Sequence, residues 1–308
     1  MKTNGVMDGS DSPGLKSDPR IHTAWANYFV KFIKAYSQRG INFWGLTPQN
    51  EPLFAAPWEA CVYSGREEGE FVANYLGPAL DAASLSHLNL MIYDHNRGHL
   101  PQFVRDFMAV PGAEKYVAGI AFHWYDNQSF AAVAEVHDEY PQHFVLGTEA
   151  CNCPGVQVGS WSRGESYGFD IIGDLLAGAS GWVDWNLILD LQGVPNHLNN
   201  YCDAGIIVNN TDKADISYFL QPSYFFMGHF SRFFRPNDTV IESSWDGVVN
   251  QLYCVSTRSH HRNSRAPLAT VCMNQADSEE EFALTDGEEY LDVKLPPHSI
   301  ASITWGTD

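Results

Sequence analysis

Basic residues are scarce in this chain. Its 308 residues include 18 Lys and Arg against 37 Asp and Glu, and the formal net charge is −19 at pH 7. A surface of this sign repels polyanions, so we expect no nucleic-acid partner and no attraction to an anionic membrane at neutral pH.

Long apolar segments and a cysteine scaffold are missing as well. No apolar run reaches the ~18 residues of a membrane span. Residues 1–9 lack the apolar segment of a secretory signal, so we expect no export signal in this chain. The six cysteines contain no CxxC pair, and most of them are expected to be buried thiols. The 44% of hydrophobic and 13% of aromatic residues suffice for a core and for flat faces that suit sugar binding.

Helical and strand-like segments alternate over the first 236 residues. The apolar residues of 21–38 recur at spacings of three and four, which predicts a helix, and the apolar run 41–46 predicts a buried strand. Four more pairs and a last helix at 219–234 follow, with helices at 66–83, 100–110, 130–140 and 163–179 and strands at 88–93, 117–124, 144–148 and 182–189. This alternation predicts a parallel sheet, and the uninterrupted apolar strands predict burial on both faces, inside a barrel or a doubly wound sheet.

The pattern changes at residue 237, after which short segments rich in Val, Ile, Tyr and Thr are separated by turn residues. We therefore predict two domains, 1–236 and 237–308, of which the second is a small β-domain. Before this boundary, the segment 190–217 is long for a structureless loop in a compact domain, which favours a binding role for it.

Two glutamates stand where predicted strands end. Glu51 follows the strand that ends near Thr47, and Glu149 follows the strand 144–148. In a parallel αβ barrel both would project from the carboxyl-terminal face, where active sites lie. Two carboxyl groups about 5 to 5.5 Å apart can cleave a glycosidic bond, because one protonates the leaving oxygen while the other attacks the sugar and retains its configuration. The pair therefore predicts a retaining glycosidase.

The triplet Asn50-Glu51-Pro52 resembles the acid/base motif of many retaining β-glycosidases built on αβ barrels. The chain as a whole is similar to glycoside hydrolase family 30, and most closely to its acid glucosylceramidase branch. The similarity runs almost end to end, through residues 23–32, 119–125, 148–151, 159–164, 181–187 and 228–231. It implies an α/β fold in which 1–236 form the C-terminal five strand–helix units of a (β/α)8 TIM barrel and 237–308 a small β-sandwich-type domain.

The resemblance also implies roles for single residues. Glu51 would be the general acid/base, Glu149 the nucleophile, and Asn50 the residue that hydrogen-bonds the sugar 2-hydroxyl beside the nucleophile. The other substrate-binding residues that it implies are His123 and Tyr125, which would hold the nucleophile and the sugar, Trp185 and Asn200, which match residues that contact glucose, and Trp58, a wall of the aglycone entrance.

Neither a metal nor another cofactor is expected. Cys151 and Cys153 lie just past Glu149, but two cysteines this close in the chain, with no matching His or Cys pair elsewhere, make a poor metal site.

The similarity begins partway through the fold of the family. Five strand–helix units are counted where the family has eight, and an Asp and a Trp that grip the glucose in relatives have no counterpart here. The loop after Pro52 also looks shorter than in the animal enzymes, which leaves the aglycone preference open. We hypothesise that the chain is N-terminally incomplete and begins at an internal Met, because five strands cannot close such a barrel.

Three functions remain open at this point. The first is a retaining β-glycosidase that hydrolyses the β-glucosyl bond of glucosylceramide or a related β-glucoside by double displacement. The second is a catalytically incompetent, truncated sugar-binding fragment, and the third is a family relative that cuts another β-glycan, such as β-xylan or β-1,6-glucan. The resemblance further implies a lysosomal or secreted protein of sphingolipid metabolism that meets its lipid at a membrane surface with an activator protein. The residues indicate no oligomeric state.

Overall fold

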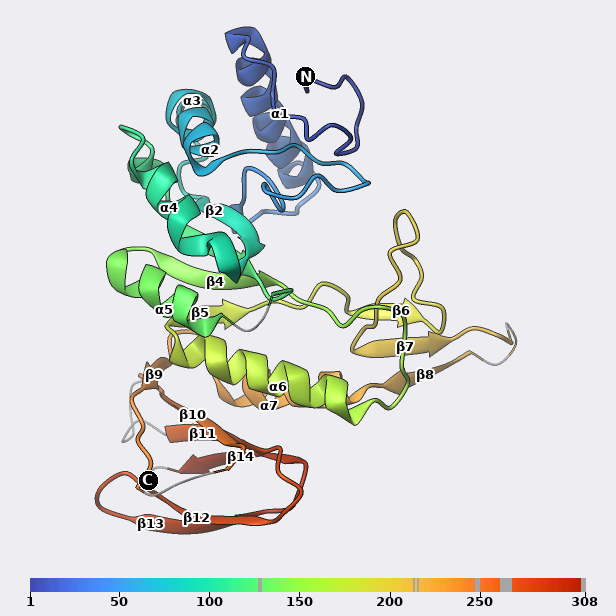
Figure 1. Cartoon of the computed structure of the whole chain (residues 1–308), viewed down its shortest axis with the longest axis vertical. Helices are drawn as coiled ribbons and strands as arrows, with labels where there is room; N and C mark the ends of the chain where they lie inside the picture. Colours follow the sequence, from blue (N-terminus) through green and yellow to red (C-terminus); the bar gives the residue numbers. More distant parts are fainter. Residues whose placement is uncertain (127–128, 213, 215, 247–249, 261–267, 306–308) are drawn as a thin grey trace. The chain divides into compact units, whose positions relative to one another are not determined.

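The computed structural model describes residues 1–126, 129–212, 214, 216–246, 250–260 and 268–305 (Figure 1). The chain divides into two compact units. The first consists of Met1–Ala150 and Ala177–Val183, and the second of Cys151–Leu176 and Asp184–Asp308. The domain boundary between residues 236 and 237 stays a prediction.

Helix α1 (Pro19–Ser37) begins the regular structure of the first unit. Asp18 caps it, because its side chain accepts a hydrogen bond from a backbone N–H of the first turn. Trp25 and Phe29 pack against the core from the apolar face of the helix, as their spacing predicts. The helix ends before Gly40, whose φ of 80° is a left-handed conformation that favours glycine.

Five parallel strands form the sheet of the first unit. They are neighbours in chain order, as β1 (Gly45–Leu46), β2 (Asn89–Asn96), β3 (Gly119–His123), β4 (Phe144–Glu149) and β5 (Ala179–Trp182). Parallel neighbours need crossover connections, so the predicted strand–helix alternation is confirmed. Every residue of β3 is buried, as expected for a strand covered on both faces. The strand predicted at 41–46 shrinks to its last two residues.

Helices connect these strands at the predicted positions. They are α2 (Gly65–Phe71), a π-helical turn (Val72–Leu76) and α3 (Gly77–Ala82) between β1 and β2, then α4 (Leu100–Met108) and α5 (Phe130–Glu139), with 3-10 turns at Arg97–His99 and Glu114–Tyr116. A capping box starts α2, in which Ser64 and Glu67 satisfy each other's backbone N–H groups. Apolar side chains from α1 to α5 and from the strands share one buried core.

The strand predicted at 182–189 is wrong. The helix before it ends at Leu176, and Gly178, with a φ of 95°, turns the chain directly into β5 at Ala179. The strand therefore lies earlier than its apolar pattern suggested, and residues 188–190 belong to a different sheet.

Two helices that lie side by side, α6 (Trp161–Leu176) and α7 (Pro222–Phe233), belong to the second unit (Figure 1). A Cβ on Gly164 or Gly168 of α6 would lie 2.6 Å or 2.8 Å from ring atoms of Phe226 of α7, so both glycines permit close packing. The helix predicted at 219–234 begins too early, since residues 217–220 form a strand. Pro222 then starts the helix, because its fixed φ suits a first turn.

The segment 190–217 is not structureless. It contributes to a three-stranded sheet in the order β6 (Ile188–Asp190), β7 (Ile206–Asn209) and β8 (Ser217–Leu220), with β6 parallel and β8 antiparallel to β7. A small cluster of Leu189, Ala204 and Ile207 holds it. The binding role suggested for this segment stays a prediction.

The C-terminal residues form the predicted small β-domain. Its four-stranded sheet has the order β14 (Ser299–Trp305), β11 (Leu268–Asn274), β10 (Leu252–Arg258) and β9 (Thr239–Ile241), and its two-stranded sheet pairs β12 (Glu280–Thr285) with β13 (Tyr290–Leu295). All pairs are antiparallel. Leu252, Cys272 and Leu295 join one cluster from both sheets, which makes the domain a sandwich. Among the described helices, none is long and apolar enough to cross a bilayer.

Disulfides correct the cysteine prediction. Cys254 pairs with Cys272 across β10 and β11, and Cys153 pairs with Cys202 between two loops, so four of the six cysteines are not thiols. Cys61 and Cys151 keep their thiols and are buried. The prediction failed because pairing depends on which Cβ atoms meet in the fold, and the spacing of cysteines along a chain does not reveal this.

Candidate active site

Glu51 and Glu149 lie close together in the first unit. Glu149 is the last residue of β4, and Glu51 lies in the loop after β1. One carboxylate oxygen of each, and one ring nitrogen of His123, all lie within 4.8 Å of one another. Their side chains are only 13% and 20% exposed. The structure thus brings together the two carboxyl groups on which the predicted chemistry depends.

His123, the last residue of β3, lies between these carboxyl groups, and its side chain is fully buried. Its Nδ1 is 3.3 Å from Oε1 of Glu51, and its Nε2 is 3.9 Å from Oε2 of Glu149. A third carboxylate, that of Asp94, lies closer still, with Oδ1 3.0 Å from Nε2. The histidine therefore links both predicted catalytic residues to a group that the sequence analysis missed.

Asp94 is held from several sides. Its Oδ1 also accepts a hydrogen bond from the hydroxyl of Thr148 at 2.7 Å, and its Oδ2 accepts one from the hydroxyl of Thr47 at 2.6 Å. Its backbone carbonyl accepts the N–H of Glu51 at 2.9 Å. The same signal that identified the two glutamates could have found it, because Asp94 directly follows the predicted strand 88–93.

Local irregularities of the sheet place these side chains. The register between β2 and β3 skips Asp94, and the register between β3 and β4 skips Thr148. A bulge of this kind re-aims a side chain at the end of a strand. Asp94 and Glu51 also have φ angles of 57° and 47°, a left-handed region that costs a residue other than glycine free energy. Strained backbone at both positions is typical of a functional site.

The charges of the site follow from burial and from these contacts. Burial lowers the pKa of His123, but hydrogen bonds to Asp94 and Glu51 and the nearby negative charges outweigh this and raise the pKa to about 9. Burial raises the pKa of Asp94, yet the hydrogen bonds from His123 and the two threonines bring the pKa below its ordinary value. At neutral pH, His123 is therefore an imidazolium whose two N–H groups both donate.

The predicted nucleophile also has a shifted pKa. Burial raises the pKa of Glu149, and the negative charges of Glu51 and Asp94 add to the rise. The positive charge of His123 and a hydrogen bond from Tyr125 oppose it. Both opposing groups thus favour the ionised form, which is the form that a carboxylate nucleophile needs.

Tyr125 is where the resemblance predicts it. Its hydroxyl donates to Oε1 of Glu149 at 3.0 Å, and its backbone N–H donates to the side chain of Asn96 at 3.1 Å. Asn50, next to Glu51 in the chain, is exposed. Trp58 is half-buried, and its ring meets that of Phe54 edge-on with centroids 5.9 Å apart. Of these three residues, Tyr125 is the one with a direct contact to a predicted catalytic carboxylate.

Trp185 and Asn200 belong to the second unit and are described there. Trp185 is 44% exposed, and its backbone N–H bonds to the carboxyl group of Asp184, whose pKa burial raises to about 6. Asn200 is half-buried, and its backbone N–H donates to the carbonyl of His197 at 3.1 Å. Their predicted contact with a sugar stays a prediction.

The spacing of Glu51, His123 and Glu149 would also suit a metal ion, but the chemistry of the donors does not. An imidazolium has no lone pair for a metal, and both ring nitrogens of His123 already face carboxylates. The same residues fit an acid–base site, in which two carboxyl groups at short range share one cation.

Comparison with known proteins agrees with this site. A family profile described as the glycosyl hydrolase family 30 TIM-barrel domain matches residues 1–234. "Putative glucosylceramidase 4" of Caenorhabditis elegans is 40% identical over 262 residues, which is 80% of this chain and 50% of that protein. "Lysosomal acid glucosylceramidase" of Mus musculus is 33% identical over 321 residues, 99% of this chain and 60% of that protein. The chain thus spans about half the length of these relatives.

Solved structures are similar over nearly the whole chain. SrfJ from Salmonella typhimurium is 30% identical, with a TM-score of 0.90 over 100% of this chain and 66% of that one. The endo-β1,6-glucanase BT3312 is 25% identical, with a TM-score of 0.80 over 94% of this chain and 64% of that one. The predicted fold, part of a TIM barrel with an added β-domain, is confirmed.

Proposed function

Because this chain belongs to glycoside hydrolase family 30, we propose that it carries the active site of a retaining β-glycosidase, with Glu149 as nucleophile and Glu51 as general acid/base. The observation that carries the proposal is the approach of one oxygen of each carboxyl group to within 4.8 Å, on either side of His123. Retaining glycosidases need the two groups about 5 to 5.5 Å apart, whereas inverting ones leave room for a water at roughly 6.5 to 9.5 Å.

The first chemical step follows from the charges. Ionised Glu149 attacks the anomeric carbon, and Glu51 gives its proton to the leaving oxygen, which yields a glycosyl-enzyme. Glu51 then takes a proton from water, which attacks the same carbon and releases the sugar with its original configuration. Two features of the site support this division of roles. Tyr125 and His123 stabilise negative charge on Glu149, and the N–H of His123 faces Glu51.

We propose glucosylceramide or a related β-glucoside as the substrate. The two glucosylceramidases above support this choice by their identity to the chain, whereas the similarity to an endo-β1,6-glucanase supports a β-glucan as the alternative. In this proposal Asn50, Trp58, Trp185 and Asn200 bind the substrate. A lysosomal or secreted location, an activator protein and a membrane surface belong to the same proposal. So does the division into a catalytic part, 1–236, and a β-domain, 237–308.

Covalent labelling tests the proposed roles. A β-glucose-configured cyclitol epoxide should attach to Glu149 in the wild-type chain, and peptide mass spectrometry should find it on the tryptic peptide 116–163. Glu149→Gln should remain unlabelled, whereas Glu70→Gln, an exposed site on α2, should label like the wild type. Folded wild-type protein that takes no label would contradict the proposal and support the catalytically incompetent alternative.

Product analysis then decides the substrate. Proton NMR of fresh hydrolysate should show the β-anomer first, as retention requires. Glucosylceramide, β-1,6-glucan and β-xylan should be assayed side by side at equal concentration of sugar bonds. Faster release from either polysaccharide would replace the glucosylceramide proposal but leave the carboxylate roles intact.

A further inference from the structure

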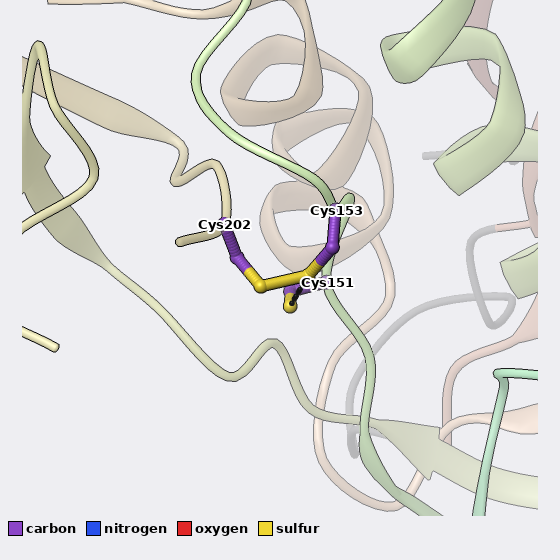
Figure 2. Close-up of side chains that lie close together, drawn as sticks. All are labelled: Cys151, Cys153 and Cys202. Carbon is purple, nitrogen blue, oxygen red and sulfur yellow. Dashed lines mark hydrogen bonds between the residues drawn. A yellow bond between two sulfur atoms is a disulfide. The ribbon is translucent and has the colours of Figure 1, made fainter. Parts of the chain in front are cut away.

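Three sulfur atoms meet in the second unit, just past the predicted nucleophile in the chain. Cys153 and Cys202 form a disulfide, and the thiol of Cys151 lies with its Sγ 3.2 Å from the Sγ of Cys153 (Figure 2). A thiol at this distance from a disulfide sulfur is close to the position from which thiol–disulfide exchange proceeds.

The three cysteines differ in access. Cys153 is exposed, whereas Cys151 and Cys202 are 2% and 1% exposed. A small thiol in solution can therefore reach the sulfur of Cys153 first. A buried thiol is a poor nucleophile until a partner is presented to it, because burial disfavours the thiolate.

We propose that Cys151, Cys153 and Cys202 form a thiol–disulfide exchange site that holds one disulfide in either of two pairings. A small thiolate attacks Cys153, the bond from Cys153 to Cys202 breaks, and Cys202 leaves as a thiolate that takes a proton. Cys151 loses its proton and attacks Cys153 in turn, which forms the bond between Cys151 and Cys153 and releases the small thiol unchanged. One disulfide and one thiol are present before and after, so no oxidant or reductant is consumed.

The surrounding backbone makes the exchange reversible. The N–H of Asp203 donates to the carbonyl of Asn152 at 2.8 Å, and the N–H of Gly155 donates to the carbonyl of Tyr201 at 2.8 Å. These bonds hold the two loops together on both sides of the disulfide. Cys202 therefore stays near Cys153 after it is released, and a return to the first pairing needs no large movement.

An ionic contact adds to this frame. The guanidinium of Arg163 donates to the carboxylate of Asp203 and to the carbonyls of Gly155 and Pro154, the latter two at 2.6 Å and 3.0 Å. The side chain of Gln221 donates to the same carboxylate at 2.9 Å. The network orders the loops without help from the disulfide, so exchange should loosen the segment around Cys202 rather than unfold it.

The exchange has a consequence for substrate binding that rests on the proposed function. Cys202 lies two residues after Asn200, a proposed glucose contact, and Cys151 lies two residues after Glu149. In the first pairing the disulfide tethers the loop of Asn200, and in the second pairing that tether is absent. We expect KM for a β-glucoside to rise severalfold in the second pairing, with a smaller change in kcat.

Peptide mapping tests the exchange itself. In the sequence, trypsin releases peptide 116–163 with Cys151 and Cys153, and peptide 164–213 with Cys202. Protein produced without N-glycosylation is incubated with reduced glutathione, quenched in acid and alkylated under denaturing conditions. The two peptides should be linked before treatment. Afterwards peptide 116–163 should appear unlinked and lighter by two hydrogens, and Cys202 should be alkylated.

Two comparisons sharpen this test. Cys151→Ser removes the resolving thiol, so glutathione should accumulate on Cys153, whereas Cys61→Ser should exchange like the wild type. The disulfide of Cys254 and Cys272 within one molecule is an internal control that should keep its pairing. Treated wild-type protein in which Cys151 is always alkylated, with no bond to Cys153, overturns the proposal even if Cys151→Ser does not fold. Exchange without a change in KM would contradict only the consequence for substrate binding.

Discussion

Asp94 and His123 form a buried pair, with Oδ1 of the carboxylate 3.0 Å from Nε2 of the ring. The other ring nitrogen faces Glu51 at 3.3 Å, so the aspartate acts on the predicted acid/base residue through the histidine. Because it touches no substrate in the proposed reaction, Asp94 is a positioning residue. The hydroxyls of Thr47 and Thr148 hold it from the opposite sides.

Replacing Asp94 by Asn should lower the pKa of His123 from about 9, because the hydrogen bond to the charged carboxylate is the largest contact that raises it. The folded-state pKa lies above the unfolded value, so the stability that the histidine contributes is complete below pH 6.5 and is lost as pH rises through about 9. Asp94→Asn should therefore cost about 3 kcal/mol near pH 6 and less at pH 10. Denaturant melts at both pH values, with an NMR titration of His123, measure this, and an equal loss at both would contradict it.

Tyr125→Phe should shift the pH dependence of activity. The tyrosine hydroxyl helps to keep the pKa of Glu149 down against burial, so its removal should raise that pKa further. The ionised nucleophile then disappears at a higher pH as the solution is acidified, and the acidic limb of kcat/KM should move to higher pH, with a roughly tenfold loss at neutral pH. The exposed Tyr28→Phe is the matched control. An unchanged acidic limb would mean that Tyr125 does not tune the nucleophile.

The two glutamates should differ in their response to the leaving group. Glu149→Gln should lose about 10⁴-fold in kcat on every substrate, because no nucleophile remains. Glu51→Gln should lose about 10²- to 10⁴-fold on an alkyl β-glucoside. On a dinitrophenyl β-glucoside, whose leaving group needs no proton, it should still show a burst of phenolate equal to one per site. If Glu149→Gln gave the burst and Glu51→Gln did not, the assigned roles would be reversed.

Glu68 is a buried carboxyl group beneath the site. Its side chain is 0% exposed, and its Oε1 accepts the backbone N–H of Tyr93 at 3.2 Å. Burial raises the pKa to about 8, and the charge of Asp94 adds to the rise. The folded form therefore holds a proton that the unfolded form releases near pH 4.5, and stability should fall as pH rises from 4.5 to about 8.

Glu68→Gln keeps an acceptor for Tyr93 and carries no charge. It should match the wild type in stability at pH 5 and exceed it at pH 9, by up to about 5 kcal/mol. Denaturant melts at the two pH values measure the difference, and Glu70→Gln, exposed on the same helix, should show none. A constant difference between wild type and Glu68→Gln across this range would show that Glu68 is not protonated in the fold.

Much of the first unit could be predicted because its elements carry local signals. The spacing of Trp25 and Phe29, and Gly40 just past the helix end, place α1 within two residues of its observed start. Predictions failed where a few residues decide. The turn at Gly178 starts β5 early, and pairing with β7 makes a strand of 217–220, whose aromatic residues had suggested the start of a helix.

From the sequence alone came the two glutamates, since polar residues that follow apolar runs mark strand ends whatever surrounds them. Only the tertiary structure decided that Asp94 joins them, that Cys153 pairs with Cys202, and that Cys151 lies against that bond. The reason is physical. A bulge, a disulfide and a buried charge each depend on atoms that are distant in the chain and adjacent in the fold, and no local pattern of residues records such contacts.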